Sequence, residues 1–218
     1  MRTTKIPLYT LALLVVTACS AGSNTRPVAA SAVQLENSTW YAAPYVIQFL
    51  AREKVLVSGG DVAGIAPDGA EGTYSLRDGK VHVKVMDESR DGEFDGSSLT
   101  FDGRPAVRLE SAIKDGHVEG TVLIASQYGN LMTTILQRDI TALGWKIGDT
   151  LTVQVGDKTF DTALVNDYKD VAEGAYLAQT VENGLLELAI RWRAEEKLSL
   201  AKESDASVGA KVTVSRKG

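Results

Sequence analysis

The chain has 218 residues, which is enough for one large domain or two small ones. Apolar residues make up 44% and charged residues 23% of the chain, close to ordinary globular usage, so a disordered protein is not expected. The formal net charge of −5 argues against a nucleic-acid partner, which would require a basic surface.

Residues 1–18 have the features of a secretory signal peptide. Arg2 and Lys5 precede an apolar stretch over residues 6–16, which is too short for a membrane-spanning anchor. The stretch leads into VTAC, which resembles the bacterial lipobox, the motif in which the cysteine is lipidated and becomes the first residue of the mature chain. The alternative is a plain signal peptide that has a chance cysteine, Cys19, at its end.

Cysteine usage favours the lipoprotein interpretation. Cys19 is the only cysteine, so an exported protein has neither a disulfide nor a thiolate metal site here. An unpaired thiol is unusual in an oxidising compartment unless acylation consumes it, and several acyl chains such as palmitate would anchor the protein stably. Ser20, directly after the cysteine, resembles the residue found in lipoproteins that are sorted to the outer membrane. We therefore expect the protein to be anchored to the outer membrane, at its periplasmic face. Residues 19–32 are small and polar and are predicted to form a flexible tether.

Residues 33–116 have the pattern of antiparallel hairpins. Asp-Gly pairs, a strong hairpin signal, recur at 68–69, 78–79, 91–92, 95–96, 102–103 and 115–116. The segment GKVHVKVMD alternates strictly, with Val81, Val83 and Val85 on one face, as in a half-buried strand. We interpret STWYAAPYVIQF, EKVLVSGG, EGTYSLRD and SSLTFDG as similar short strands. The first domain is therefore predicted to be an antiparallel barrel or sheet.

Residues 117–218 contain no Asp-Gly pair and are predicted to form a second domain. TVLIA, TLTVQV, LLELAI and AKVTVS are typical of strands. LQRDITALGWKIG carries Leu136, Ile140 and Leu143 at helical spacing, and RAEEKLSL is predicted to be a second short helix. The fold class expected is mainly β, with a hairpin-rich barrel or sheet followed by a β-barrel-like domain with two short helices.

The usual motifs of catalytic and metal sites are missing from the sequence. His82 and His117 are the only histidines, and neither a Gly-x-Ser-x-Gly elbow nor a Gly-rich phosphate loop occurs. DESRDGEFDG at 87–96 has some of the spacing of a calcium loop, but its twelfth position is Ser98 where a Glu is needed. We interpret it as an acidic hairpin tip in solvent. No metal, cofactor or catalytic residue is therefore predicted.

The segment SQYGNLMTT at 126–134 interrupts an apolar run with Tyr-Gly-Asn. Gly129 and Asn130 both tolerate positive φ angles, so an ordinary turn explains them. A ring and a carboxamide beside a glycine also suit a flat ligand, and both interpretations stay open on these residues alone.

The second domain resembles the C-terminal domain of the S-adenosylmethionine hydroxide adenosyltransferase family, relatives of the S-adenosylmethionine chlorinases and fluorinases. HVEGTVLIASQYGNLMTTI is similar to the family's strand followed by Asp-x-Phe/Tyr-Gly-Asn-Leu-x-Thr-Asn-Ile. NDYKDV, GLLELAI and AEEKLSLAKESDASVGAKVTV follow in the family's order, so the resemblance covers about residues 117–218.

The resemblance implies that this domain is one wall of an adenosyl pocket. By it, Tyr128 offers a ring edge, Asn130 hydrogen-bonds the adenine, and Tyr168 stacks on the ligand. An aromatic platform and a carboxamide are chemically suited to a purine.

The chain also departs from the family pattern. Ser126 and Thr134 replace the family's Asp and second Asn, and VENG replaces a Ser-containing turn at the methionine end. Glu182 of VENG would repel the carboxylate of the ligand. The hairpins of the first domain are unlike the α/β catalytic domain that precedes this domain in the family.

These observations favour a non-catalytic, lipid-anchored envelope lipoprotein that acts as a binding or structural module. The membrane, through the lipid anchor, is the expected partner, and the sequence indicates no particular protein partner. The alternative is a protein that binds S-adenosylmethionine or adenosine through Tyr128, Asn130 and Tyr168, related to the hydrolases and halogenases of S-adenosylmethionine.

Overall fold

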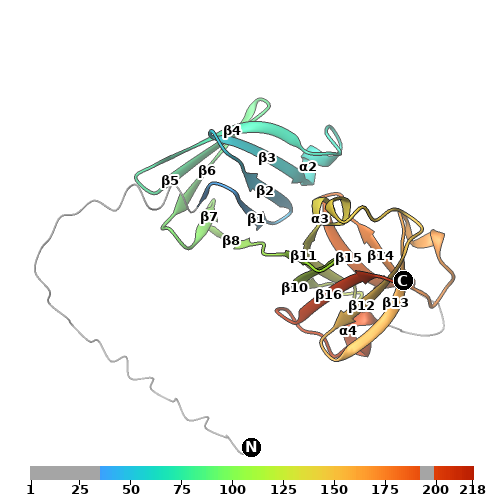
Figure 1. Cartoon of the computed structure of the whole chain (residues 1–218). Coiled ribbons are helices and arrows are strands. Elements are labelled where there is room, and N and C mark those ends of the chain that lie inside the picture. Colours follow the sequence, from blue (N-terminus) through green and yellow to red (C-terminus); the bar gives the residue numbers. More distant parts are fainter. Residues whose placement is uncertain (1–34, 192–198) are drawn as a thin grey trace, which may run out of the picture.

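The computed structural model describes residues 35–191 and 199–218. The predicted signal peptide, Cys19, the tether and residues 193–198 of the predicted helix RAEEKLSL lie outside the described residues. Figure 1 shows two bodies built from strands, the first in blue to green and the second in green to red. The fold is mainly β and has two closed barrels, as the sequence predicts.

The first barrel contains eight strands, each paired antiparallel with the next, and β1 pairs with β8 to close the ring. The strands are β1 (Ser38–Ala42), β2 (Tyr45–Phe49), β3 (Lys54–Gly59), β4 (Ala70–Arg77), β5 (Lys80–Val85), β6 (Glu88–Phe94), β7 (Leu99–Phe101) and β8 (Arg104–Arg108). In β5, Val81 and Val83 are buried while His82 and Lys84 are exposed, which confirms the predicted alternation. Closure leaves the barrel without free strand edges.

Two predictions for this barrel are wrong in detail. STWYAAPYVIQF is not one strand but the hairpin β1–β2, because Pro44 has no N–H for a ladder bond and the chain turns there. DESRDGEFDG is not a hairpin tip, because residues 88–94 form β6. The tight turn before β6 uses Met86, at φ 54°, in place of an Asp-Gly pair. The pairs at 78–79 and 102–103 do form the predicted hairpin turns.

The second barrel is a sheet of eight strands in the order β11-β15-β14-β13-β12-β16-β10-β9. Its strands are β9 (Ala112–Lys114), β10 (His117–Ala125), β11 (Leu131–Leu136), β12 (Thr150–Val155), β13 (Lys158–Leu164), β14 (Tyr176–Thr180), β15 (Leu185–Ile190) and β16 (Lys211–Arg216). Pairing of β10 with β11 closes the barrel. Strand β15 is buried along its whole length, as LLELAI predicts.

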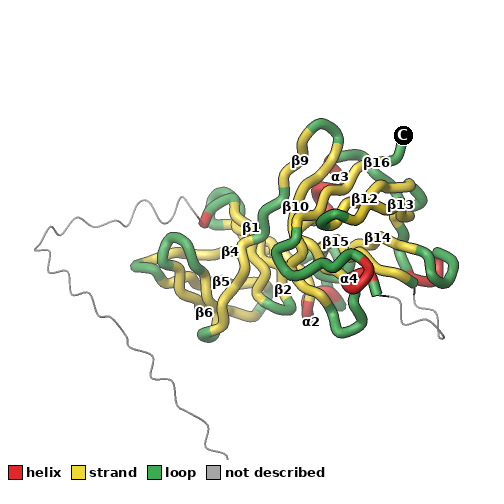
Figure 2. The backbone as a smooth tube through the Cα atoms, turned by 90° about the horizontal axis from the view of Figure 1, so that it is seen from below, coloured by secondary structure: helices red, strands yellow, loops and turns green. Residues whose placement is uncertain are grey.

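The described helices are short and lie at the ends of strands (Figure 2). Helix α3 (Gln137–Ala142) confirms the helix expected in LQRDITALGWKIG. Helix α4 (Leu200–Glu203) begins just after residues 192–198, and α2 (Gly60–Ala63) is an element of the first barrel that the sequence analysis did not predict. A 3₁₀ turn, η1, covers Tyr168–Asp170.

An apolar cluster joins the two barrels. Val46 of β2 is buried together with Leu123, Leu136 and Leu185 of the second barrel, and Leu109 of the connecting segment completes the group. These five side chains are at most 8% exposed. Burial of this kind stabilises the contact by about 1.5–3 kcal/mol for each large side chain, so the barrels support each other.

Candidate functional site

The turn of residues 126–130 connects β10 to β11 and answers why the apolar run is broken. The backbone N–H of Ser126 donates to the carbonyl of Asn130 at 2.9 Å, and that of Gly129 donates to the carbonyl of Ser126 at 2.8 Å. Gly129 has φ +80°, and a Cβ atom there would lie 1.7 Å from Oγ of Ser199. Only glycine fits this backbone angle and this close approach.

Asn130 and Tyr168, two of the three predicted ligand residues, lie together. Nδ2 of Asn130 donates to the Tyr168 hydroxyl at 2.7 Å and to Oε1 of Glu187 at 3.1 Å. The Tyr168 hydroxyl donates to Oε2 of Glu187 at 2.7 Å, and Nε2 of Gln179 donates to the same oxygen at 2.8 Å. We call these four residues the Glu187 cluster. Its donors are directed at one carboxylate of the chain itself.

The electrostatics of the cluster match this geometry. Glu187 is 8% exposed, and a buried carboxylate is stable only where donors surround it. Burial, and then the hydrogen bond to Glu187, raise the pKa of the Tyr168 hydroxyl well above its ordinary value. Tyr168 therefore remains protonated and donates to Glu187. Its ring also packs against Val165, Leu177 and Ala189, so part of the ring surface is used inside the protein.

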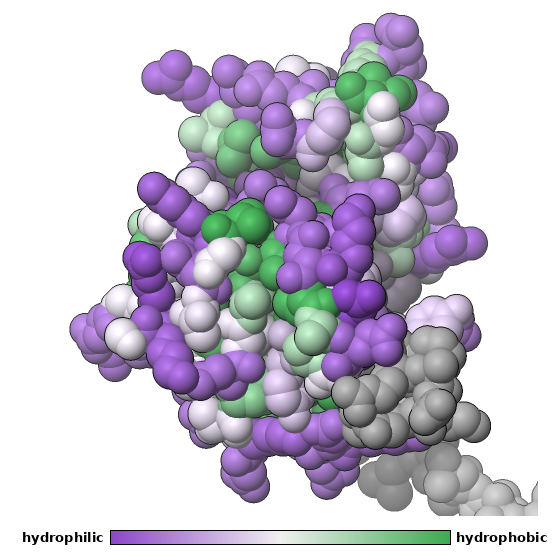
Figure 3. All heavy atoms as spheres, turned by 90° about the vertical axis from the view of Figure 1, so that its right-hand side faces the viewer, coloured by the Kyte–Doolittle hydropathy of each residue, from purple (hydrophilic) through white to green (hydrophobic). Residues whose placement is uncertain are grey.

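Tyr128, the third predicted ligand residue, is not part of this cluster. Its side chain is 75% exposed and makes no hydrogen bond within the described part of the chain. The other exposed large apolar side chains come from different elements, including Ile65 and Val208. On the face shown in Figure 3, hydrophobic groups lie in the middle and hydrophilic groups surround them.

Sequence reasoning missed Gln179 and Glu187. Both interrupt apolar runs, in YLAQT and LLELAI, and a polar residue on the buried face of a strand is a signal for an internal hydrogen-bond network. The two residues are also direct cross-strand partners in the β14–β15 ladder. Their contact thus depends on strand pairing, which the sequence does not display.

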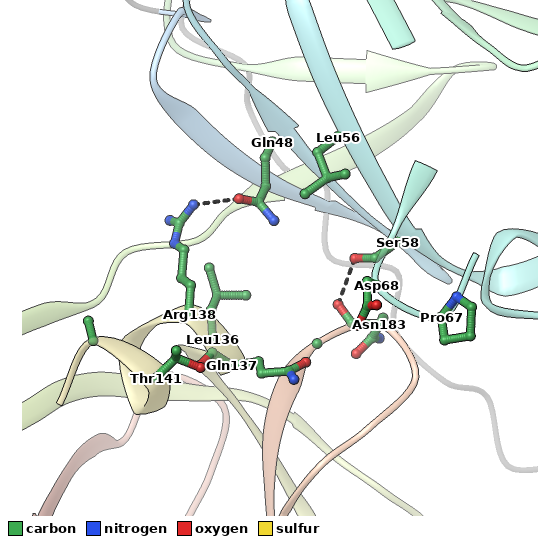
Figure 4. Close-up of a pocket in the computed structure, with 12 residues that line it drawn as sticks. Gln48, Leu56, Ser58, Pro67, Asp68, Leu136, Gln137, Arg138, Thr141 and Asn183 are labelled. Atoms are coloured by element: carbon green, nitrogen blue, oxygen red, sulfur yellow. Dashed lines mark hydrogen bonds between the residues drawn. The ribbon is translucent and has the colours of Figure 1, made fainter. Parts of the chain in front are cut away.

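A cleft of about 470 Å³ lies between the two barrels (Figure 4). Gln48, Leu56, Ser58 and Asp68 line it from the first barrel, and α3 and the turn at Asn183 line it from the second. Two hydrogen bonds cross it: Nη1 of Arg138 donates to Oε1 of Gln48 at 2.7 Å, and Oγ of Ser58 donates to the carbonyl of Asn183 at 3.0 Å. None of the predicted ligand residues lines this cleft.

Comparison with known proteins shows a similarity that is confined to the second barrel. Residues 120–207 match the SAM hydroxide adenosyltransferase C-terminal domain. None of the curated proteins matches the chain. Among solved structures, an uncharacterized conserved protein from Thermotoga maritima is 24% identical, with a TM-score of 0.45 over 49% of this chain and 39% of that one. A conserved hypothetical protein from Thermus thermophilus is 26% identical, with a TM-score of 0.31 over 44% of this chain and 34% of that one. The chain thus spans well under half the length of either.

Residues that depart from the adenosyltransferase pattern have internal roles here. Oγ of Ser126 accepts from the backbone N–H of Asn130 at 3.1 Å, within the turn. The hydroxyl of Thr134 donates to the carbonyl of Glu110 at 2.7 Å, which ties the segment between the barrels to β11. Asn183 of VENG contacts the first barrel through Ser58, whereas Glu182 is exposed.

The described residues include no group of three or more His, Cys, Asp or Glu side chains arranged to hold a metal ion. His82 is paired with Asp91 at 2.7 Å on the exposed face of the first barrel. In the same part of the chain, no helix has the length and apolar character needed to span a membrane.

Proposed function

We propose that this protein is a non-catalytic, lipid-anchored module of the bacterial envelope that acts by binding or by a structural role. One observation supports the non-catalytic part above all others. Asn130 and Tyr168, which the adenosyltransferase resemblance assigns to the ligand, direct their donors at Glu187 within the chain. A ligand would have to replace these bonds, and the loss of each hydrogen bond to a charged group costs about 1.5–3 kcal/mol.

The anchored part of the proposal rests on the N-terminal sequence. Cys19 ends a lipobox-like segment, and it is the only thiol of the chain. Acylation there would hold the two barrels at the periplasmic face of the outer membrane, with residues 20–32 as the tether.

The anchor is tested by metabolic labelling with palmitate and by membrane fractionation of three variants. Cys19→Ser should abolish labelling and release soluble protein, whereas the neighbouring control Ser23→Ala should behave as wild type. Ser20→Asp should keep the label and move the protein to the inner membrane. A Cys19→Ser protein that remains in salt-washed membranes contradicts the proposal.

A second candidate function is binding of adenosine or S-adenosylmethionine at the second barrel. The match over residues 120–207 and the contact between Asn130 and Tyr168 favour it. Because one wall and one free carboxamide oxygen would hold the purine, the dissociation constant should be on the order of 1 mM, about −4 kcal/mol.

NMR titration of adenosine and S-adenosylmethionine distinguishes the two candidates. Shifts at Tyr128 and Tyr168 that Asn130→Ala abolishes, and that the exposed control Asn166→Ala preserves, would establish nucleoside binding. Release of adenosine from S-adenosylmethionine above the uncatalysed rate would refute the non-catalytic proposal. Neither effect is expected if the Glu187 cluster is purely structural.

A further inference from the structure

The cleft between the barrels is a second concave site, separate from the Glu187 cluster. It forms where strands β2 and β3 of the first barrel face α3 and the turn before β15 (Figure 4). Its volume of about 470 Å³ is in the range of small-molecule sites, and such sites occur preferentially at domain interfaces. Leu56, Pro67 and Ala142 supply its accessible apolar surface, and the buried Leu136 forms part of the wall behind it.

The cleft carries opposite charges at its two ends. Arg138 extends from α3 at one end, and Asp68 lies at the other, beside Ser58 and Asn183 (Figure 4). Asp68 makes no hydrogen bond or ion pair within the described part of the chain. The two charges therefore do not neutralise each other. Nε of Arg138 lies 4.0 Å from Oδ1 of Asp139, so a ligand along the cleft would meet Arg138 through its Nη1 and Nη2 atoms.

Arg138 is held in place before any ligand arrives. Its guanidinium donates to Oε1 of Gln48 at 2.7 Å and to Oγ1 of Thr39 at 3.0 Å, so both contacts reach across to the first barrel. A guanidinium has five N–H donors, and those left over remain for a carboxylate. Fixing a long side chain in advance lowers the entropy cost of binding.

The amide groups of the cleft complement these charges. The side chain of Gln137 has no hydrogen-bond partner among the described residues, and Asn183 uses its Oδ1 for the backbone N–H of Leu185 while its Nδ2 stays free. Gln137 lies between the two charged ends (Figure 4) and can both donate and accept, as a peptide backbone requires. An apolar ligand would leave both charged ends of the cleft unpaired, and a ligand with a single charge would leave one end unpaired.

We infer that the cleft binds a zwitterionic ligand of short-peptide size, with its carboxylate at Arg138, its ammonium at Asp68 and an apolar side chain on Leu56. This inference rests on the binding role in the proposed function, to which it adds the class of ligand. Anchoring and the lack of S-adenosylmethionine turnover are measured separately, so either conclusion can fail alone.

The test is titration of the full chain, purified in mild detergent, with the tripeptide Ala-Leu-Ala and its two blocked forms. The free tripeptide should bind with a dissociation constant on the order of 1 mM. Acetylation of its N-terminus or amidation of its C-terminus should each weaken binding about ten-fold, because each removes a charge-assisted contact.

Variants assign the two ends of the ligand. Arg138→Gln should weaken the free tripeptide about ten-fold and make C-terminal amidation harmless, and Asp68→Asn should do the same for N-terminal acetylation. Arg138→Lys, which keeps the charge, should retain most of the preference for a free carboxylate. The matched controls Arg90→Gln and Asp102→Asn lie on the first barrel outside the cleft and should change nothing.

Two results would overturn the inference. One is the absence of binding by the free tripeptide at concentrations on the order of 10 mM, ten times the expected constant. The other is equal binding of the free and blocked peptides. If Arg138→Gln proved unfolded by circular dichroism, Asp68→Asn and Arg138→Lys would still decide, since neither removes the positive charge that contacts the first barrel.

Discussion

Removing one hydroxyl from the Glu187 cluster should destabilise the second barrel by a measurable amount. Tyr168→Phe deletes a 2.7 Å hydrogen bond to a carboxylate that is 8% exposed. Hydrogen bonds to charged groups contribute about 1.5–3 kcal/mol. Asn130 loses one acceptor but keeps Oε1 of Glu187, and Gln179 still donates to the carboxylate, so no buried group is left without a partner. We therefore expect a loss near the lower end, about 1.5 kcal/mol.

The assay is urea unfolding followed by circular dichroism and by tryptophan fluorescence, to which Trp145 in the core of the second barrel and Trp40 in the core of the first both contribute. Tyr128→Phe is the matched control, because the same atom is removed from a side chain that is 75% exposed; it should change the free energy of unfolding by less than about 0.5 kcal/mol. Equal stability of the two variants would refute the argument that the cluster is structural. It would then favour a ligand as the reason for Tyr168.

Three further perturbations test other features of the second barrel. Gly129→Ala should cost about 2 kcal/mol or more of unfolding free energy in urea, because φ is +80° and the new Cβ would meet Ser199; full stability would contradict the described turn. Lys158→Met should lower the free energy of unfolding by about 1 kcal/mol at neutral pH, since it breaks the 2.6 Å ion pair with Glu203. The hydrogen bond from Lys158 lowers the pKa of Glu203 in the folded chain. The difference between wild type and variant should therefore shrink when thermal unfolding is measured below the unfolded-state pKa of Glu. The raised pKa of Tyr168 means that the folded chain keeps a proton that the unfolded chain loses above about pH 10, so stability should fall there with rising pH, more steeply in wild type than in Tyr168→Phe.

Local pattern predicted much of the fold. Alternation in GKVHVKVMD, the Asp-Gly turns and the apolar run LLELAI each give the element that the structure contains, because strand period, turn chemistry and burial are properties of neighbouring residues. Where the pattern failed, a tertiary contact decided. Gly92 belongs to an Asp-Gly pair but lies within β6, where a Cβ would come 2.4 Å from the carbonyl of Thr100. A glycine is therefore required at position 92 by the close packing of the strands and not by a turn.

The candidate sites depend on contacts between residues far apart in sequence. Asn130 and Glu187 meet because β11 pairs with β15, and Gln179 joins them because β14 pairs with β15 on the other side. The cleft needs both barrels, and Arg138 and Gln48 are 90 residues apart. No spacing rule within one segment could have predicted either arrangement, although polar residues inside apolar strands marked the positions of Gln179 and Glu187.

Strand β15 connects the two sites. Its first residues follow the Asn183 turn at the cleft, and Glu187, in the same strand, holds the cluster. A buried carboxylate surrounded by donors from the turn before β11, from β14 and from η1 is satisfied in only one strand register, since a shift by one residue would move Glu187 to the other face. By fixing this register, the cluster also fixes where the Asn183 turn meets Ser58. Residues that resemble a ligand site in the adenosyltransferase pattern can thus be kept because they position the strand on which the inter-barrel cleft depends.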